Sequence, residues 1–262
     1  MRSALAVALS LVVATAACKS DKKPQGTDPA VVTDAMAAVA DRLRVVSDYS
    51  YEGVAENLDN GEKVTFSYAL RQPRMLRADV KEMQTSFIFD GTNLAVIEGA
   101  NKRVLRQDLS KKDEVTIVGA LHQMFESYSV EGWRPPMLRT KREALSGRVE
   151  TGEGGPVWVI TSALDDPDLK EVRYYLRPPR ADFVKKEFVA KDGSVVASST
   201  VLEEKLDEKT RLRFPIAWEH RDARRRYRVR LSETQVNPGL GPERFQIKAP
   251  EGFAVEEVGA GG

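Results

Sequence analysis

The hydrophobic pattern of the chain changes its period just before Tyr49. Between residues 29 and 46 apolar side chains recur three or four positions apart, the spacing of one face of an α-helix. Asp28 can cap the first turn, and Pro29 suits the first helical position. From Tyr49 onward the period is two, as in strands with one buried face. The pattern therefore predicts one amphipathic helix over 29–46, followed by a strand-rich region.

Alternating segments recur along most of the chain after Tyr49. Asp59-Asn60-Gly61 and Asp192-Gly193 have the composition of hairpin turns. The apolar positions that alternate are Val64/Phe66/Tyr68/Leu70, Leu76/Ala78/Val80, Phe87/Phe89, Leu94/Val96, Val157/Val159, Val172/Tyr174/Leu176, Leu212/Phe214/Ile216/Trp218 and Tyr227/Val229/Leu231. We expect about ten or more antiparallel strands.

A second helical period interrupts the strands. Between Asp113 and Tyr128 apolar residues are again three or four positions apart, at Val115, Val118, Leu121 and Phe125. The acidic pair Asp113-Glu114 favours the start of a helix, because negative charge stabilises the N-terminal end of the helix dipole. We therefore expect a second helix over 114–127.

The N-terminus has the pattern of an export signal. Arg2 precedes an apolar stretch over residues 4–14 that is too short to span a bilayer. Thr15-Ala16-Ala17-Cys18 follows, and it resembles a bacterial lipobox, in which the cysteine becomes the acylated first residue of the mature protein. We expect residues 1–17 to be a signal peptide and Cys18 to be lipidated. The alternative is a secreted protein cut after Ala17 that carries a free thiol.

The rest of the chain predicts one domain. Residues 18–26 are polar, charged and broken by Pro and Gly, so they are expected to form a flexible tether behind the lipidated cysteine. After residue 27 no Pro/Gly/Ser-rich linker and no long internal repeat follows. We expect a single domain over 27–258 and a flexible tail over 259–262.

Composition excludes several functional classes. The 40 Lys and Arg nearly balance the 39 Asp and Glu, so no overall field favours binding to nucleic acid. No apolar run after residue 17 is long enough for a membrane-spanning helix. Two histidines and one cysteine are too few for an ordinary zinc site. We expect no metal, no cofactor and no nucleic-acid partner.

The sequence also lacks familiar catalytic motifs. It contains no Gly-x-Ser-x-Gly elbow, His-Glu-x-x-His, P-loop or Rossmann glycine fingerprint. His122 falls on the second predicted helix, and His220 ends a strand among charges. Adjacent carboxylates, as in Asp165-Asp166, Glu203-Glu204 and Glu256-Glu257, point in different directions in a strand or turn and favour solvated surface. We expect no catalytic residue and no enzyme.

The densest charged segment is a run of arginines near the C-terminus. In a strand, Arg226, Arg228 and Arg230 share one face, while Tyr227 and Val229 share the other. The arginine face is a candidate contact for lipid head groups or an acidic partner, since each arginine near an anionic membrane contributes about 1 kcal/mol. The alternative is a solvated strand face without a partner.

Three segments carry a resemblance to a known family. Gln72-Pro73-Arg74-Met75-Leu76-Arg77, then Ser86–Leu94, then Phe245–Val255 with its Pro250-Glu251-Gly252 turn, follow one helix and a strand pair. This order resembles the outer-membrane lipoprotein carrier superfamily (LolA, LolB, RseB and relatives). In many members an Arg-Pro stands where this chain has Gln72-Pro73, and that arginine helps to latch the lid helices.

The resemblance implies a mainly β (α+β) fold, an unclosed antiparallel β-barrel with helices as a lid on its concave face. The strand pattern is compatible with it, for example at Val157–Ile160, which is apolar on both faces. Phe245–Val255 would form the closing strand. The cavity is implied by the resemblance, because pattern alone does not separate a cavity from a filled core.

The resemblance further implies a membrane-anchored envelope protein, facing the periplasm from the outer membrane, that binds acyl chains or lipoproteins. Lys19 agrees with outer-membrane delivery, since Asp after the lipidated cysteine retains lipoproteins at the inner membrane of enteric bacteria. The apolar positions expected to contact the ligand are Phe66, Tyr68, Phe87, Phe89, Val118, Leu121, Met124 and Phe125. The alternatives are a protein-binding envelope-stress or assembly module and, last, a lipid or glycan hydrolase, which would need a Ser/His/Asp or paired-carboxylate cluster.

Overall fold

The computed structural model describes residues 27–72, 75–111, 145–152 and 154–258. The expected signal peptide, Cys18, the tether and the tail at 259–262 lie outside these residues. So does the second expected helix, over 114–127, with its four candidate ligand contacts: Val118, Leu121, Met124 and Phe125.

The helix at the start of the described chain forms as predicted. Helix α1 spans Pro29–Val45, and the Asp28 side chain accepts a hydrogen bond of 2.8 Å from the Ala30 amide. Pro29 occupies the first turn, where its missing N–H costs no hydrogen bond. One face of α1 is buried, through Val31, Val32, Ala35, Val39 and Arg42. The chain leaves the helix at Val46, which is extended.

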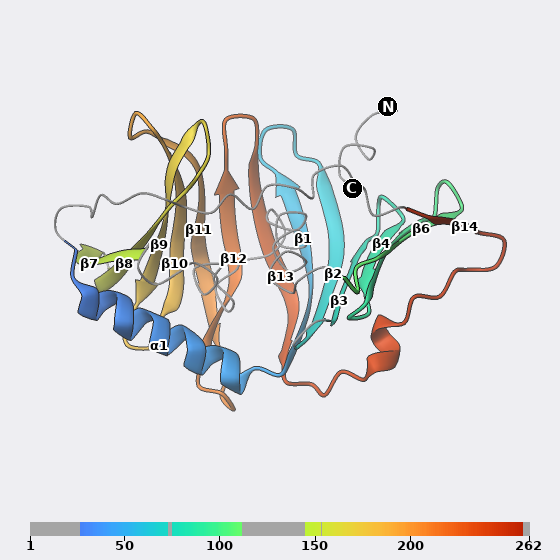
Figure 1. Cartoon of the computed structure of the whole chain (residues 1–262), viewed down its shortest axis with the longest axis horizontal. Helices are drawn as coiled ribbons and strands as arrows, with labels where there is room; N and C mark the ends of the chain where they lie inside the picture. Colours follow the sequence, from blue (N-terminus) through green and yellow to red (C-terminus); the bar gives the residue numbers. More distant parts are fainter. Residues whose placement is uncertain (1–26, 73–74, 112–144, 153, 259–262) are drawn as a thin grey trace.

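The described strands form one sheet of 14 strands (Figure 1). Their bounds are β1 Asp48–Asn57, β2 Lys63–Arg71, β3 Met75–Val80, β4 Thr85–Phe89, β5 Asn93–Glu98, β6 Arg103–Asp108, β7 Leu145–Gly152, β8 Gly155–Ala163, β9 Leu169–Arg177, β10 Asp182–Ala190, β11 Val195–Leu206, β12 Arg213–Arg221, β13 Arg226–Val236 and β14 Ala254–Glu257. The prediction of many antiparallel strands is confirmed, as is the hairpin at Asp59-Asn60-Gly61 between β1 and β2.

The sheet is built from two runs of neighbouring hairpins joined by one distant pairing. Strands β1 to β6 pair in sequence, and so do β7 to β13. The two runs meet where β1 pairs antiparallel with β13, with a bulge between Glu52 and Gly53. The strand order begins at β14 and ends at β7, so the sheet remains open between these two strands. The expected unclosed barrel is confirmed.

The C-terminal segment differs from the expected closing strand over 245–255. A 3-10 helix spans Pro242–Phe245 and buries the Phe245 side chain completely. A turn follows, in which the Phe253 amide donates to the Pro250 carbonyl and Gly252 has a φ of +77°, a conformation that favours glycine. After this turn, β14 pairs with β6 in parallel. This pairing differs from the antiparallel arrangement that the sequence predicted for the strands. That 27–258 folds as a single domain stays a prediction.

Candidate functional site

The register of the first strands places the four described candidate contacts on one face. Phe66 and Tyr68 of β2 lie opposite Val80 and Ala78 of β3. The pairing of β3 with β4 extends this face to Phe87 and Phe89. Phe66, Tyr68 and Phe89 are buried, whereas Phe87 is half-buried and packs against the same cluster. The structure therefore brings together these four predicted residues.

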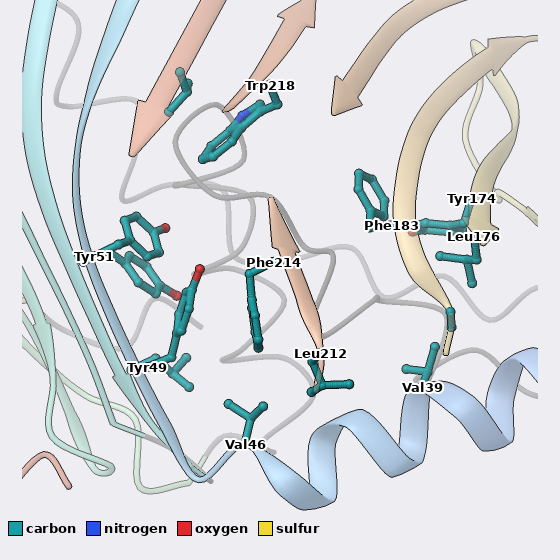
Figure 2. Packing of buried hydrophobic residues seen from close by; sticks show 14 of the residues in the cluster. Val39, Val46, Tyr49, Tyr51, Tyr174, Leu176, Phe183, Leu212, Phe214 and Trp218 are labelled. Carbon is teal, nitrogen blue, oxygen red and sulfur yellow. The ribbon is translucent and has the colours of Figure 1, made fainter. Parts of the chain in front are cut away.

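The same face continues across the distant strands. Tyr49 and Tyr51 of β1 point toward Phe214 and Trp218 of β12, while Phe183 and Leu176 approach from the other side of the curve (Figure 2). Tyr51 stacks on Tyr68 with ring centroids 5.0 Å apart, and Tyr49 stacks on Phe214 at 5.4 Å. This surface, lined by apolar side chains from both runs of hairpins, is called the concave face below.

The concave face is aromatic but includes hydroxyl groups. Burial raises the pKa of the Tyr49 phenol well above its ordinary value, and nearby Tyr68 adds to the shift. Tyr49 therefore stays neutral at any physiological pH. A neutral aromatic surface favours apolar groups through burial of their area, about 25 cal/mol per Å².

Helix α1 covers one end of the concave face. Its first turns pack on β7, where the Gly147 backbone lies so close that an added Cβ would come within 2.9 Å of Val32 Cγ2. At its last turns Arg42 is 1% exposed and bonds to Asp182 Oδ1 of β10 at 2.5 Å and to the Arg213 carbonyl at 2.6 Å. The Arg42 guanidinium also lies 5.5 Å from the centre of the Phe214 ring. These contacts attach the helix at both ends of its length.

Polar residues that sequence reasoning missed lie at the other end of the concave face. Ser199 Oγ of β11 and His220 Nδ1 of β12 are 2.9 Å apart, and Lys186 of β10 pairs with Ser199 across the strands. His220 is 7% exposed and Lys186 is 6% exposed. The adjacent lysines 185 and 186 gave no sequence signal, because only strand register shows which of the two faces inward.

In the cluster around His220, the nearest carboxylate is set apart from the imidazole. Asp222 Oδ2 lies 3.7 Å from His220 Nε2, which is longer than a hydrogen bond that would orient the imidazole. Partial burial alone would raise the pKa of Asp222, but its hydrogen bonds from the Arg224 and Arg225 amides and the proximity of His220 lower that pKa. Asp222 is thus held by its own turn.

Neither a metal-binding cluster nor a membrane-spanning helix occurs among the residues that the structure describes. Among those residues no group of three or more His, Cys, Asp or Glu side chains could hold a metal ion. No helix there has the length and apolar character needed to cross a membrane.

Solved structures, by contrast with sequences, match this chain. No protein-family model and no curated protein sequence matches it. A domain named for outer membrane lipoprotein sorting, from Vibrio parahaemolyticus, aligns with a TM-score of 0.55 and 13% identity, over 82% of this chain and 97% of that chain. The fold is LolA-like.

Two more structures support that conclusion. A DUF1329 family protein from Desulfovibrio piger aligns with a TM-score of 0.56 and 12% identity, over 84% of this chain and 98% of its own length. A LolA superfamily protein from Nitrosomonas europaea aligns with a TM-score of 0.50 and 11% identity, over 82% and 98%. The expected LolA-like half-barrel is therefore confirmed as a fold.

Gln72, where the resembled family often has an arginine, lies at the end of α1. Gln72 Nε2 donates to the Val46 carbonyl at 2.5 Å, and the Gln72 amide donates to the Ser47 carbonyl at 2.8 Å. Asn237 after β13 donates from Nδ2 to the Val45 carbonyl and accepts from the Ser47 amide. The end of α1 is thus fixed by neutral amide side chains that directly follow β2 and β13.

The arginine face lies on the opposite, convex side of the LolA-like sheet. Arg226 and Arg228 both bond to Glu219, at 3.3 and 3.2 Å, and Arg230 bonds to Glu203 at 3.1 Å. These carboxylates offset much of the positive charge that the sequence alone indicates. The three arginines share one face as predicted, and their contact with lipid head groups or a partner stays a prediction.

Proposed function

We propose that this protein is an envelope lipoprotein that binds acyl chains, or the acylated end of lipoproteins, on the concave face of its half-barrel. The observation that carries the proposal is the continuous apolar lining of that face, from Phe89 in β4 to Trp218 in β12. The LolA-like fold supports it, because one structure with that fold is named for lipoprotein sorting. Binding by apolar burial needs no catalytic group, in keeping with a carrier or receptor.

The proposal requires the concave face to exchange one set of apolar contacts for another. Phe66, Tyr68 and Phe89 are buried in this structure, so a ligand must replace contacts that already cover them. Each large side chain contributes about 1.5–3 kcal/mol by burial, and similar amounts are regained with the ligand. Binding is therefore expected to be reversible, with the concave face covered either by the protein's own side chains or by the ligand.

A charge on the concave face is expected to abolish most of this binding. The full-length chain carrying Cys18→Ala, purified without detergent, should take up a fluorescent fatty acid. Adding Phe87→Glu should weaken uptake at least tenfold, because Phe87 is half-buried on the concave face and a carboxylate there must be desolvated beside the acyl chain. Titration of fluorescence against protein concentration measures the change.

Val54→Glu is the matched control for Phe87→Glu. Val54 is 37% exposed and alternates with Gly53, so it lies on the convex face. This variant should bind the fatty acid like the parent. Equal loss in both variants, or no uptake by the parent, would contradict the proposed function.

The membrane anchor is proposed to be Cys18. Cys18→Ala should move the protein from the membrane fraction to the soluble envelope fraction, because several acyl chains are needed for stable attachment and each buried methylene contributes about 0.8 kcal/mol. Fractionation followed by immunoblotting measures this. The variant remaining in the membrane fraction would show that another part of the protein holds it there.

A further inference from the structure

A row of polar side chains crosses the concave face, with one residue from each of the five neighbouring strands β9 to β13. Tyr174 of β9 pairs with Lys186 of β10, Lys186 with Ser199 of β11, Ser199 with His220 of β12, and His220 with Tyr227 of β13. Paired residues in adjacent strands point to the same side, so these five side chains form one line. The line is distinct from the apolar positions assigned above.

Lys186 supplies a positive charge to this row. Its Nζ lies 4.5 Å from the centre of the Phe188 ring and 6.0 Å from that of Tyr174. Lys185, its neighbour in sequence, points to the convex face and bonds to Glu187 at 2.5 Å. A buried ammonium is costly unless anions or aromatic faces stabilise it. Its three N–H donors allow an incoming anion to bind beside the contacts that Lys186 already makes.

Ser199 and His220 add polar groups next to this charge. Their side chains are joined at 2.9 Å, and His220 is buried. Because the two side chains share a hydrogen bond, one donor of the pair is used between them, and the other, the Ser199 hydroxyl or the His220 Nε2–H, can donate to a carboxylate or phosphate oxygen. The three residues lie on consecutive strands, about 4.8 Å apart, which is within the reach of one head group.

The row lies at the opposite end of the strands from helix α1. Along β12, Phe214 lies near Arg42 of the helix, Trp218 comes next on the same face, and His220 follows toward the other end. The six residue steps from Phe214 to His220 span about 20 Å of extended strand. The distance between α1 and the polar row therefore suits an elongated apolar chain that replaces the buried side-chain contacts there, with its polar end at the row.

We propose that Lys186, Ser199 and His220 bind the anionic head group of an amphiphile, a carboxylate or phosphate, whose acyl chain lies along the apolar concave face. The inference rests on the proposed function and adds an orientation and a charge preference to it. Because Lys186 carries the charge, an uncharged amphiphile of equal chain length binds more weakly.

The test compares ligands that share one chain and differ in head group. Hexadecanoic acid, hexadecyl phosphate and hexadecanol displace a fluorescent hydrophobic probe from the full-length Cys18→Ala chain. Both acids should bind at least tenfold more tightly than the alcohol. Lys186→Gln should weaken binding of the acids about 10- to 100-fold, the range for a charged hydrogen bond, and change that of the alcohol less than about threefold. The stronger of the two acids identifies carboxylate or phosphate as the preferred group.

Lys185→Gln is the matched control, since it removes an equal charge from the convex face, and it should leave all three affinities unchanged. If Lys186→Gln fails to fold, Ser199→Ala, a smaller change, replaces it as the test variant. It should weaken binding of the two acids several-fold. Equal binding of acid and alcohol by the parent overturns this inference and leaves the proposed function standing. Binding of none of the three overturns both.

Discussion

Replacing Arg42 with methionine is expected to lower the free energy of unfolding by about 3–5 kcal/mol. The guanidinium is 1% exposed, and its removal leaves the Asp182 carboxylate and the Arg213 carbonyl without their donor. Burial lowers the pKa of Arg42, and the proximity of Asp182 and its hydrogen bond oppose that shift. Urea unfolding followed by circular dichroism measures the loss.

Two further variants test the reason for the loss at Arg42. Arg42→Met combined with Asp182→Leu removes both charges, so it should recover a large part of the stability. Arg44→Met, in the same helix but with a 77% exposed side chain, should change stability by less than about 0.5 kcal/mol. Equal losses in the single and double variants would show that the charge pair is not the cause.

The sequence predicted elements whose stability is local. Helix α1 was predicted over 29–46 and observed over Pro29–Val45, because its cap, its proline and its apolar face all lie within the segment. The strands from β2 to β5 were also predictable, since apolar residues alternate along them in the sequence, and in β3 the burial alternates in the same way. By contrast, β11 carries no fully buried residue along its twelve positions, and its strand pattern is correspondingly weak.

The candidate site was predicted only in part, because its face depends on pairing between distant segments. Phe66 and Phe89 were named from strand alternation together with the family resemblance, whereas Lys186 and His220 join them only through the pairings of β10 to β13. The contact between β1 and β13 unites residues about 180 positions apart, and no local pattern encodes it. Similarly, the net charge of the arginine face depends on Glu219 and Glu203, which only strand pairing brings next to the arginines.

Replacing Trp218 with alanine is expected to destabilise the protein by about 3–5 kcal/mol, the cost of removing a large aromatic side chain from a packed core. Trp218 is 2% exposed and belongs to the buried cluster of the concave face. The midpoint of thermal unfolding should fall by roughly 10 °C for a domain of this size. Calorimetry or circular dichroism measures the shift.

Leu202→Ala is the control for Trp218→Ala on the neighbouring strand. Leu202 is 46% exposed, so its truncation should cost less than about 0.5 kcal/mol. Because Trp218 lies between Phe214 and the polar row along β12, its truncation also opens space where the proposed acyl chain would lie. Hexadecanoic acid should then stabilise the variant by a different amount from the parent chain, since a ligand of the native state raises the free energy of unfolding with the logarithm of its concentration over Kd. Stabilisation by the ligand equal to that of the parent chain would place the acyl chain away from Trp218.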